Sequence, residues 1–86
     1  MLMKLKDNVA ISESGFLFDS NTGESFSVNA TGKEILKLVS KGESMSDIEQ
    51  VILEKYDIDS LTFQRYIDDF SHTLRRFMLI ENEDDE

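Results

Sequence analysis

The spacing of apolar and polar residues changes near residue 29. Before it, apolar residues come in two brief runs, at residues 9–12 and 15–19, and then alternate with polar residues over 24–28. Alternation of this kind is typical of half-buried strands. Residues 13–15 suit a tight hairpin, and residues 19–23 collect side chains that bond to their own backbone or tolerate positive φ. The first part of the chain therefore predicts three antiparallel strands in a meander.

From Asn29 onward, apolar residues recur at helical spacing. Asn29 is a favourable N-cap for a first helix that ends near Lys41 and Gly42. A second helix is expected to run to about Lys55, with Ile48, Val51, Ile52 and Tyr56 as its apolar stripe. Two overlapping capping patterns can start it, namely Ser44 with Asp47 and Ser46 with Glu49.

A third helix is expected after residues 57–60, with Asp59 as its cap. Arg75 and Arg76 fall in its last turn, where positive charge is favourable. Its apolar residues span roughly 100° of the helical wheel. They are Phe63, Tyr66, Ile67, Phe70, Leu74 and Phe77. Residues 78–80 form a short apolar end, which we expect to pack as an extended segment.

The predicted order is β-β-β-α-α-α, which places the chain among α+β domains in which a small antiparallel sheet is covered by helices. Two short helices joined by a tight turn, followed by a longer third helix, also resemble a winged-helix arrangement. With 86 residues the chain holds one domain at most. We assign this domain to residues 1–80.

Residues 81–86 carry five negative charges and no apolar side chain. Segments of this composition cannot bury enough apolar surface to offset the entropy lost on ordering, so we expect a disordered acidic tail. Without these five charges, the formal net charge of −9 becomes −4. The domain itself is therefore only mildly acidic.

Small size and the lack of cysteine limit the chemistry. A chain this short has little room for an internal catalytic cavity, so we expect no enzymatic activity. The absence of Cys excludes disulfides, thiolate metal sites and a Cys nucleophile. No apolar run has the length of a signal peptide or a membrane helix. We therefore expect a cytoplasmic protein without a cofactor.

His72, the only histidine, lies opposite the apolar stripe of the third helix and is expected to face water. Asp68 stands four residues earlier and can form a weak surface pair with it. Ser71 and His72 are adjacent on the helix and point about 100° apart, so they make no nucleophile–base pair. A metal site needs three or four converging ligands, which we cannot assemble. We therefore assign no catalytic residue and no metal ligand.

The winged-helix resemblance raises the alternative of a DNA-binding transcription factor. A recognition helix presents basic or amide side chains to base edges within a positive field. Here the third helix carries Asp68 and Asp69 as well as its arginines, and the domain is net negative. Weak attraction to phosphate makes this a second hypothesis. A third hypothesis is a small interaction domain separated from a larger enzyme.

A strand at the edge of a three-stranded sheet can instead accept an extended peptide as an additional strand. The backbone then supplies affinity, and pockets for alternate side chains supply selectivity. The third expected strand, at residues 24–28, and the third helix are candidates for the two walls of such a groove.

Residues 22–38 resemble the T-G-x-x-aromatic-x-x-N-x-T/A-x-x-x-I-x-x-L stretch of the PqqD-like family. Residues 42–48, 53–59 and 70–80 resemble three later segments of the same family, in the same order. The resemblance covers about residues 5–80 without a gap. Two residues depart from the family pattern, because many members have Asp where Tyr66 stands and Gly where Met78 stands.

The resemblance implies a non-catalytic peptide chaperone, also called a RiPP recognition element. Members bind the leader segment of a ribosomally made precursor peptide and present it to a modifying enzyme, often a radical SAM protein, as in the synthesis of pyrroloquinoline quinone (PQQ). The leader is thought to add to the third strand, opposite the third helix. The implied partners are a precursor peptide and a modifying enzyme, with no nucleic acid and no membrane.

Carried onto this chain, the resemblance assigns peptide-binding residues to two elements. On the third strand these are Ser25, Phe26, Ser27 and Val28. On one flank of the third helix they are Tyr66, Asp69, Thr73 and Arg76. Phe26, Val28 and Phe70 are expected first of all as core residues, whereas Tyr66 can pack its ring while its hydroxyl reaches the rim.

Overall fold

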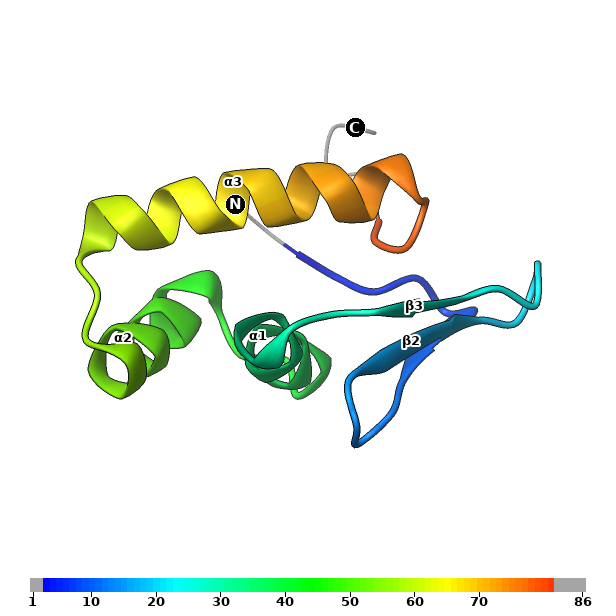
Figure 1. Cartoon of the computed structure of the whole chain (residues 1–86), viewed down its shortest axis with the longest axis horizontal. Coiled ribbons are helices and arrows are strands. Elements are labelled where there is room, and N and C mark those ends of the chain that lie inside the picture. Colours follow the sequence, from blue (N-terminus) through cyan, green and yellow to red (C-terminus); the bar gives the residue numbers. More distant parts are fainter. Residues whose placement is uncertain (1–2, 82–86) are drawn as a thin grey trace.

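The structure is a computed structural model, and it describes residues 3–81. Three strands precede three helices (Figure 1), which confirms the α+β order predicted from the sequence. The elements are β1 (Val9–Ile11), β2 (Phe16–Asp19), β3 (Ser25–Ser27), α1 (Ala30–Ser40), α2 (Met45–Tyr56) and α3 (Ser60–Arg76). The acidic tail expected at residues 81–86 lies outside the described residues, except for Glu81.

The strands form an antiparallel sheet in the order β1-β2-β3. Leu17 pairs with Phe26 across β2 and β3, and its side chain is completely buried. The two hairpin turns contain Gly15 and Gly23, with φ of +93° and +78°. Glycine adopts this left-handed region without the steric cost that a Cβ would add. The turns thus set the register that directs Leu17 toward the core.

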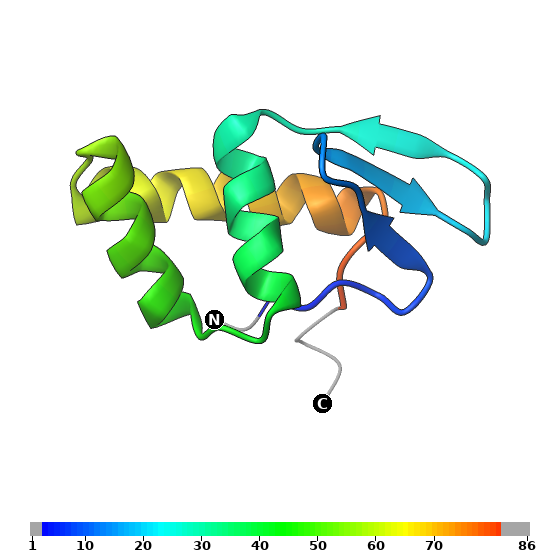
Figure 2. The ribbon, with the colours of Figure 1, turned by 90° about the horizontal axis from the view of Figure 1, so that it is seen from below.

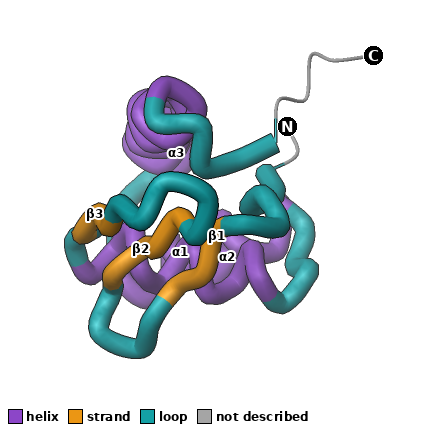
Figure 3. The backbone as a smooth tube through the Cα atoms, turned by 90° about the vertical axis from the view of Figure 1, so that its right-hand side faces the viewer, coloured by secondary structure: helices purple, strands orange, loops and turns teal. Residues whose placement is uncertain are grey.

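The helices lie to one side of the sheet. In Figure 2, α1 stands between α2 and the sheet, while α3 crosses behind them. The C-terminal half of α3 lies beside the sheet (Figure 1), and the view in Figure 3 shows β3 and β1 at opposite edges of the sheet. This arrangement brings one edge of the sheet and one helix together, although they are far apart in the sequence.

One apolar core joins the sheet to all three helices. Its fully buried large side chains are Leu17, Ile35, Leu36, Ile48, Ile52, Phe63, Ile67 and Leu79. Burying a side chain of this size contributes about 1.5–3 kcal/mol. In a chain without disulfides, this core is the main source of stability.

Three apolar residues that the sequence pattern placed in the core are exposed. Val51 is 38% exposed. Around the axis of α2, Val51 and Ile52 lie on opposite sides of Ile48, and the core covers the side of Ile52. Phe77 is 48% exposed at the end of α3. Met78 is 66% exposed, and its φ of +60° turns the chain after the helix. The prediction of a packed segment at residues 78–80 is therefore wrong for Met78.

The other two residues of that segment close the domain. Leu79 and Ile80 are buried, and Ile80 forms an antiparallel bridge with Leu5. Lys6 N donates to Leu79 O at 3.1 Å, and Glu81 N donates to Lys4 O at 2.7 Å. These bonds hold the segment after α3 against the beginning of the chain.

Each helix begins at a side-chain cap that the sequence contains. Asn29 Oδ1 accepts from Gly32 N at 2.8 Å, and Asp59 Oδ1 accepts from Thr62 N at 2.8 Å. Of the two capping patterns proposed for α2, the structure uses Ser44, whose Oγ accepts from Asp47 N. The local signals therefore located the starts of α1 and α3, whereas the choice between the two patterns for α2 came from the structure.

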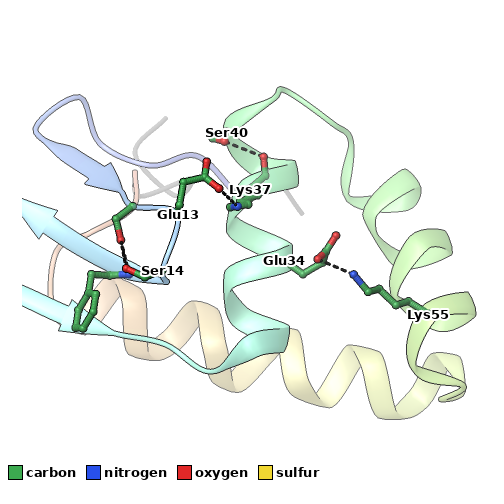
Figure 4. Close-up of polar contacts among 8 residues, drawn as sticks. Glu13, Ser14, Glu34, Lys37, Ser40 and Lys55 are labelled. Carbon is green, nitrogen blue, oxygen red and sulfur yellow. Dashed lines mark hydrogen bonds and ion pairs between the residues drawn. The ribbon is translucent and has the colours of Figure 1, made fainter.

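Two exposed ion pairs connect neighbouring elements (Figure 4). Lys37 Nζ lies 2.9 Å from Glu13 Oε1, and Lys55 Nζ lies 2.9 Å from Glu34 Oε1. Exposed pairs of this kind contribute at most about 1 kcal/mol each. None of the helices that the structure describes is long and apolar enough to cross a bilayer.

We predict opposite effects for two near neighbours after α3. Ile80→Ala should lower the free energy of unfolding by about 2–4 kcal/mol, because it leaves a cavity under a side chain that is only 2% exposed. Met78→Gly should raise it by roughly 0.5–1 kcal/mol, because glycine relieves the left-handed backbone. Urea unfolding measures both, and equal losses in the two variants would contradict this packing.

We also predict an acid-sensitive contribution from the cap of α3. The side-chain and backbone hydrogen bonds of Thr62 lower the pKa of Asp59. A lowered pKa in the folded state stabilises the fold above the unfolded pKa of about 3.9, and this contribution is lost as the pH falls through the folded value. Asp59→Asn keeps an acceptor but does not titrate. Unfolding curves at pH 7 and pH 3 should show a smaller acid loss for Asp59→Asn than for the wild type, and equal losses would contradict the assignment.

Candidate peptide-binding groove

A groove of about 430 Å³ runs between β3 and α3. It is lined by residues from β2, from β3 and its link to α1, from α3 and from the segment after α3. They are Leu17, Phe26, Ser27, Val28, Asn29, Tyr66, Asp69, Phe70, Thr73, Leu74, Phe77 and Leu79. Most of these side chains are apolar or aromatic, as is common in sites that bind organic ligands.

Two contacts across the groove define its ends. The rings of Phe26 and Phe77 lie 5.1 Å apart between centroids. At the other end, the Tyr66 hydroxyl donates to Asn29 Oδ1 at 3.2 Å. The chain order of these pairs shows that β3 and α3 run in opposite directions.

The floor of the groove is part of the core. Leu17, Leu74 and Leu79 are buried beneath it. Phe70 packs against α1 at Gly32, where an added Cβ would lie 3.1 Å from the ring carbon Cζ of Phe70. Gly32 is therefore needed for close approach between α1 and the wall of the groove.

The hydrogen bonds between β2 and β3 determine which backbone groups remain accessible. Asp19 N donates to Glu24 O at 2.9 Å, and Val28 N donates to Gly15 O at 3.1 Å. Bonded and non-bonded positions alternate along an antiparallel pair. The even-numbered residues from 24 to 28 thus direct their N–H and C=O groups toward β2.

The odd-numbered residues of β3 direct their backbone N–H and C=O groups to the side of the strand that faces away from β2. Within the described residues, β3 has a strand on one side only. The N–H and C=O groups of Ser25 and Ser27 therefore lie along an open edge of the sheet. An open edge of this kind is a template for pairing with another chain.

One charged side chain lines the groove among the described residues, and it is that of Asp69. The neighbouring Asp68 is exposed but does not line it. Burial raises the pKa of Tyr66, although its hydrogen bond to Asn29 acts in the opposite direction. The phenol therefore stays protonated at neutral pH and can donate.

The structure brings together most of the residues that the resemblance assigned. Phe26, Ser27, Val28, Tyr66, Asp69 and Thr73 line the groove. Ser25 lies on β3 with its backbone at the open edge, and Arg76 lies in the last turn of α3 outside the lining. Phe26, Val28 and Phe70 are partly buried and pack against the core, so they serve both core and groove.

Sequence reasoning missed one polar and one aromatic residue that line the groove. Asn29 was interpreted only as a helix cap, yet its Oδ1 also accepts from Tyr66. Phe77 was placed in the core stripe, yet its ring closes one end of the groove. The signal for Phe77 was its position at the C-cap of α3, where the regular helical spacing of the apolar stripe ends.

The groove is lined by no histidine among the described residues. His72 is exposed, as predicted, and does not line the groove. Within residues 3–81, no three His, Asp or Glu side chains gather into a group that would hold a metal ion. The chemistry available in the groove is therefore hydrogen bonding, apolar contact and one negative charge.

The family model for Coenzyme PQQ synthesis protein D (PqqD) matches residues 15–80, which include β2, β3 and all three helices. The chain belongs to the PqqD family. The resemblance inferred from residues 22–38 and from three later segments is thereby confirmed. No curated protein sequence matches this PqqD-family chain significantly.

Two solved structures share its fold. TbiB1, in complex with the TbiA(beta) leader peptide, is 28% identical, with a TM-score of 0.82 over 95% of this chain and 99% of TbiB1. A lasso peptide synthetase B1, complexed with the leader peptide, is 22% identical, with a TM-score of 0.80 over 95% of this chain and 100% of that protein. The second likeness shows the fold alone.

Proposed function

We propose that this protein binds the leader segment of a ribosomally made precursor peptide in the groove between β3 and α3. The observation that carries the proposal is the open edge of β3, with the N–H and C=O groups of Ser25 and Ser27 directed outward beside an apolar groove. Membership of the PqqD family supports it. TbiB1, which is in complex with a leader peptide, supports it further.

Binding would proceed by addition of a strand. An extended leader would exchange backbone hydrogen bonds with Ser25 and Ser27 and become the fourth strand of the sheet. Its alternate side chains would enter the groove and contact Phe26, Phe70 and Tyr66. The backbone bonds would give affinity for any extended peptide, and the side-chain contacts would select among peptides.

The charge in the groove narrows the class of leader. Asp69 is surrounded by apolar and uncharged lining residues, and the domain is net negative. A peptide that places Lys or Arg opposite Asp69 gains a charge-assisted hydrogen bond. We propose that leaders bound here combine apolar residues with such a basic residue.

The chemical step would belong to another protein. We propose that the chain has no catalysis of its own and presents the leader's precursor to a modifying enzyme, of which a radical SAM protein is the class indicated by the family resemblance. Because ribosomal precursors are made in the cytoplasm, the same proposal places the carrier there. The alternative of a DNA-binding transcription factor has no support, since α3 exposes Asp68 and Asp69.

The strand-addition proposal predicts that Ser27→Pro weakens peptide binding more than it affects folding. Proline removes an N–H that points to the open edge and not to β2, and proline is tolerated at such edges. Peptides selected from a displayed random library against the wild-type protein serve as ligands. We expect affinity to fall about tenfold or more, measured by calorimetry.

Ser27→Ala is the matched control, because it keeps the N–H and should bind as the wild type does. The melting temperatures of both variants show whether the fold is intact. Unchanged affinity in a folded Ser27→Pro protein would rule out pairing at this position.

The charge proposal predicts a change of specificity. Selection on the wild type should enrich Lys or Arg at one position of the bound peptides, whereas Asp69→Lys should select Asp or Glu at that position. Asp68→Lys makes the same charge change outside the groove and should select as the wild type does. The same preferences in all three proteins would contradict a role for Asp69.

A further inference from the structure

A second cavity, of about 330 Å³, lies next to the groove on the other side of Tyr66. It is formed where the beginning of α1, the end of α2 and the beginning of α3 meet. Its lining residues are Thr31, Ile52, Tyr56, Ile58, Thr62, Phe63 and Tyr66. Tyr66 is the residue that this cavity shares with the groove.

The cavity continues the line of the groove along α3. The groove follows α3 from Phe77 back to Tyr66, and the cavity begins one helical turn further, at Phe63 and Thr62. Figures 1 and 2 show that β3 leads directly into the start of α1, on the side where the link between α2 and α3 also lies. A chain that leaves the Asn29 end of the groove in this direction would pass over the contact between Tyr66 and Asn29 toward the cavity.

The lining selects an apolar guest. Ile52 and Phe63 are fully buried and form its floor. The ring of Tyr56 and the side chain of Ile58 are partly buried beside them. None of the described lining residues is charged, and the polar groups are hydroxyls and backbone. The volume is ample for one large aliphatic or aromatic side chain.

The distance suits the same peptide. Tyr66 and Thr62 are separated by four residues of α3, which is about 6 Å at 1.5 Å per residue. An extended peptide covers that distance in about two residues at 3.3 Å each. A peptide paired with β3 therefore needs only a short continuation to place a side chain in the cavity.

We propose that this cavity is a second anchor site, which binds one bulky apolar or aromatic side chain of the leader peptide. The anchor lies about two to four residues beyond the part that pairs with β3, past Asn29 and Tyr66. This inference rests on the proposed function. Recognition of the leader would then have two parts. Backbone pairing with β3 would tolerate many sequences, and the cavity would select one apolar or aromatic side chain.

The test uses peptides selected on the wild-type protein and found by NMR to shift the amides of β3. Each apolar residue outside the β3-paired part is replaced by Ala in turn. One replacement should reduce affinity about tenfold or more, the loss expected from leaving a large apolar side chain unburied. Thr62→Trp fills the cavity from its exposed rim, and this variant should bind the parent and the Ala peptide equally.

Gln64→Trp is the matched control, because Gln64 is exposed on α3 and lines neither cavity, and it should keep the wild-type preference. A measurement without any variant stands beside it. Contacts between the anchor side chain and the methyl groups of Ile52 and Ile58 should appear as intermolecular NOEs in the wild-type complex.

The outcomes separate the two proposals. Peptides that bind along β3 but show no sensitive residue, or no NOE to Ile52 and Ile58, would overturn the second anchor and leave the groove intact. Peptides whose sensitive residue keeps its effect in a folded Thr62→Trp protein would also overturn it. Selected peptides that leave the β3 amides unshifted would overturn the proposed function, and the anchor with it.

Discussion

The buried side chains on the inner face of α3 hold this helix beside an edge of the sheet without covering it. Phe63, Ile67 and Leu74 are almost completely inaccessible to solvent and fix the helix to the core along most of its length. Above them, Phe77 reaches across to Phe26 at one end, and Tyr66 reaches across to Asn29 at the other. Between those contacts the edge of β3 stays open. The proposed pairing of a peptide with β3 depends on that separation.

An open edge is normally a hazard, because exposed N–H and C=O groups can pair with any extended chain. Here β3 is only three residues long, and α3 limits the approach to a groove. A short edge behind a helical wall restricts pairing to peptides whose side chains fit the lining. The same feature that would cause aggregation in an unguarded sheet would thus act as a selective binding site in the proposed function.

Local signals in the sequence predicted the elements well. The helix starts at Asn29, Ser44 and Asp59 are encoded in side chains that bond within three residues, and the turns depend on single glycines. These interactions involve neighbours in the chain, so a pattern along the sequence reveals them.

Contacts between distant residues were harder to predict. The bond from Tyr66 to Asn29 and the packing of Phe77 on Phe26 join α3 to residues far earlier in the chain. Helical spacing alone placed Phe77 in the core, although its side chain is 48% exposed between the buried residues Leu74 and Leu79. The open sheet edge made β3 and α3 candidate walls of a groove, and the family resemblance implied the same two elements. The volume of the groove and the cavity beside it became apparent only in the packed structure.

The central claim is that a peptide pairs with the outward-facing groups of β3. Amide hydrogen exchange of the wild-type protein, followed by NMR with and without a selected peptide, tests it most directly. The account predicts that the amides of Ser25 and Ser27 exchange rapidly in the free protein and become protected in the complex, while that of Phe26, already bonded to β2, changes little. A saturated complex in which Ser25 and Ser27 exchange as fast as in the free protein would contradict it.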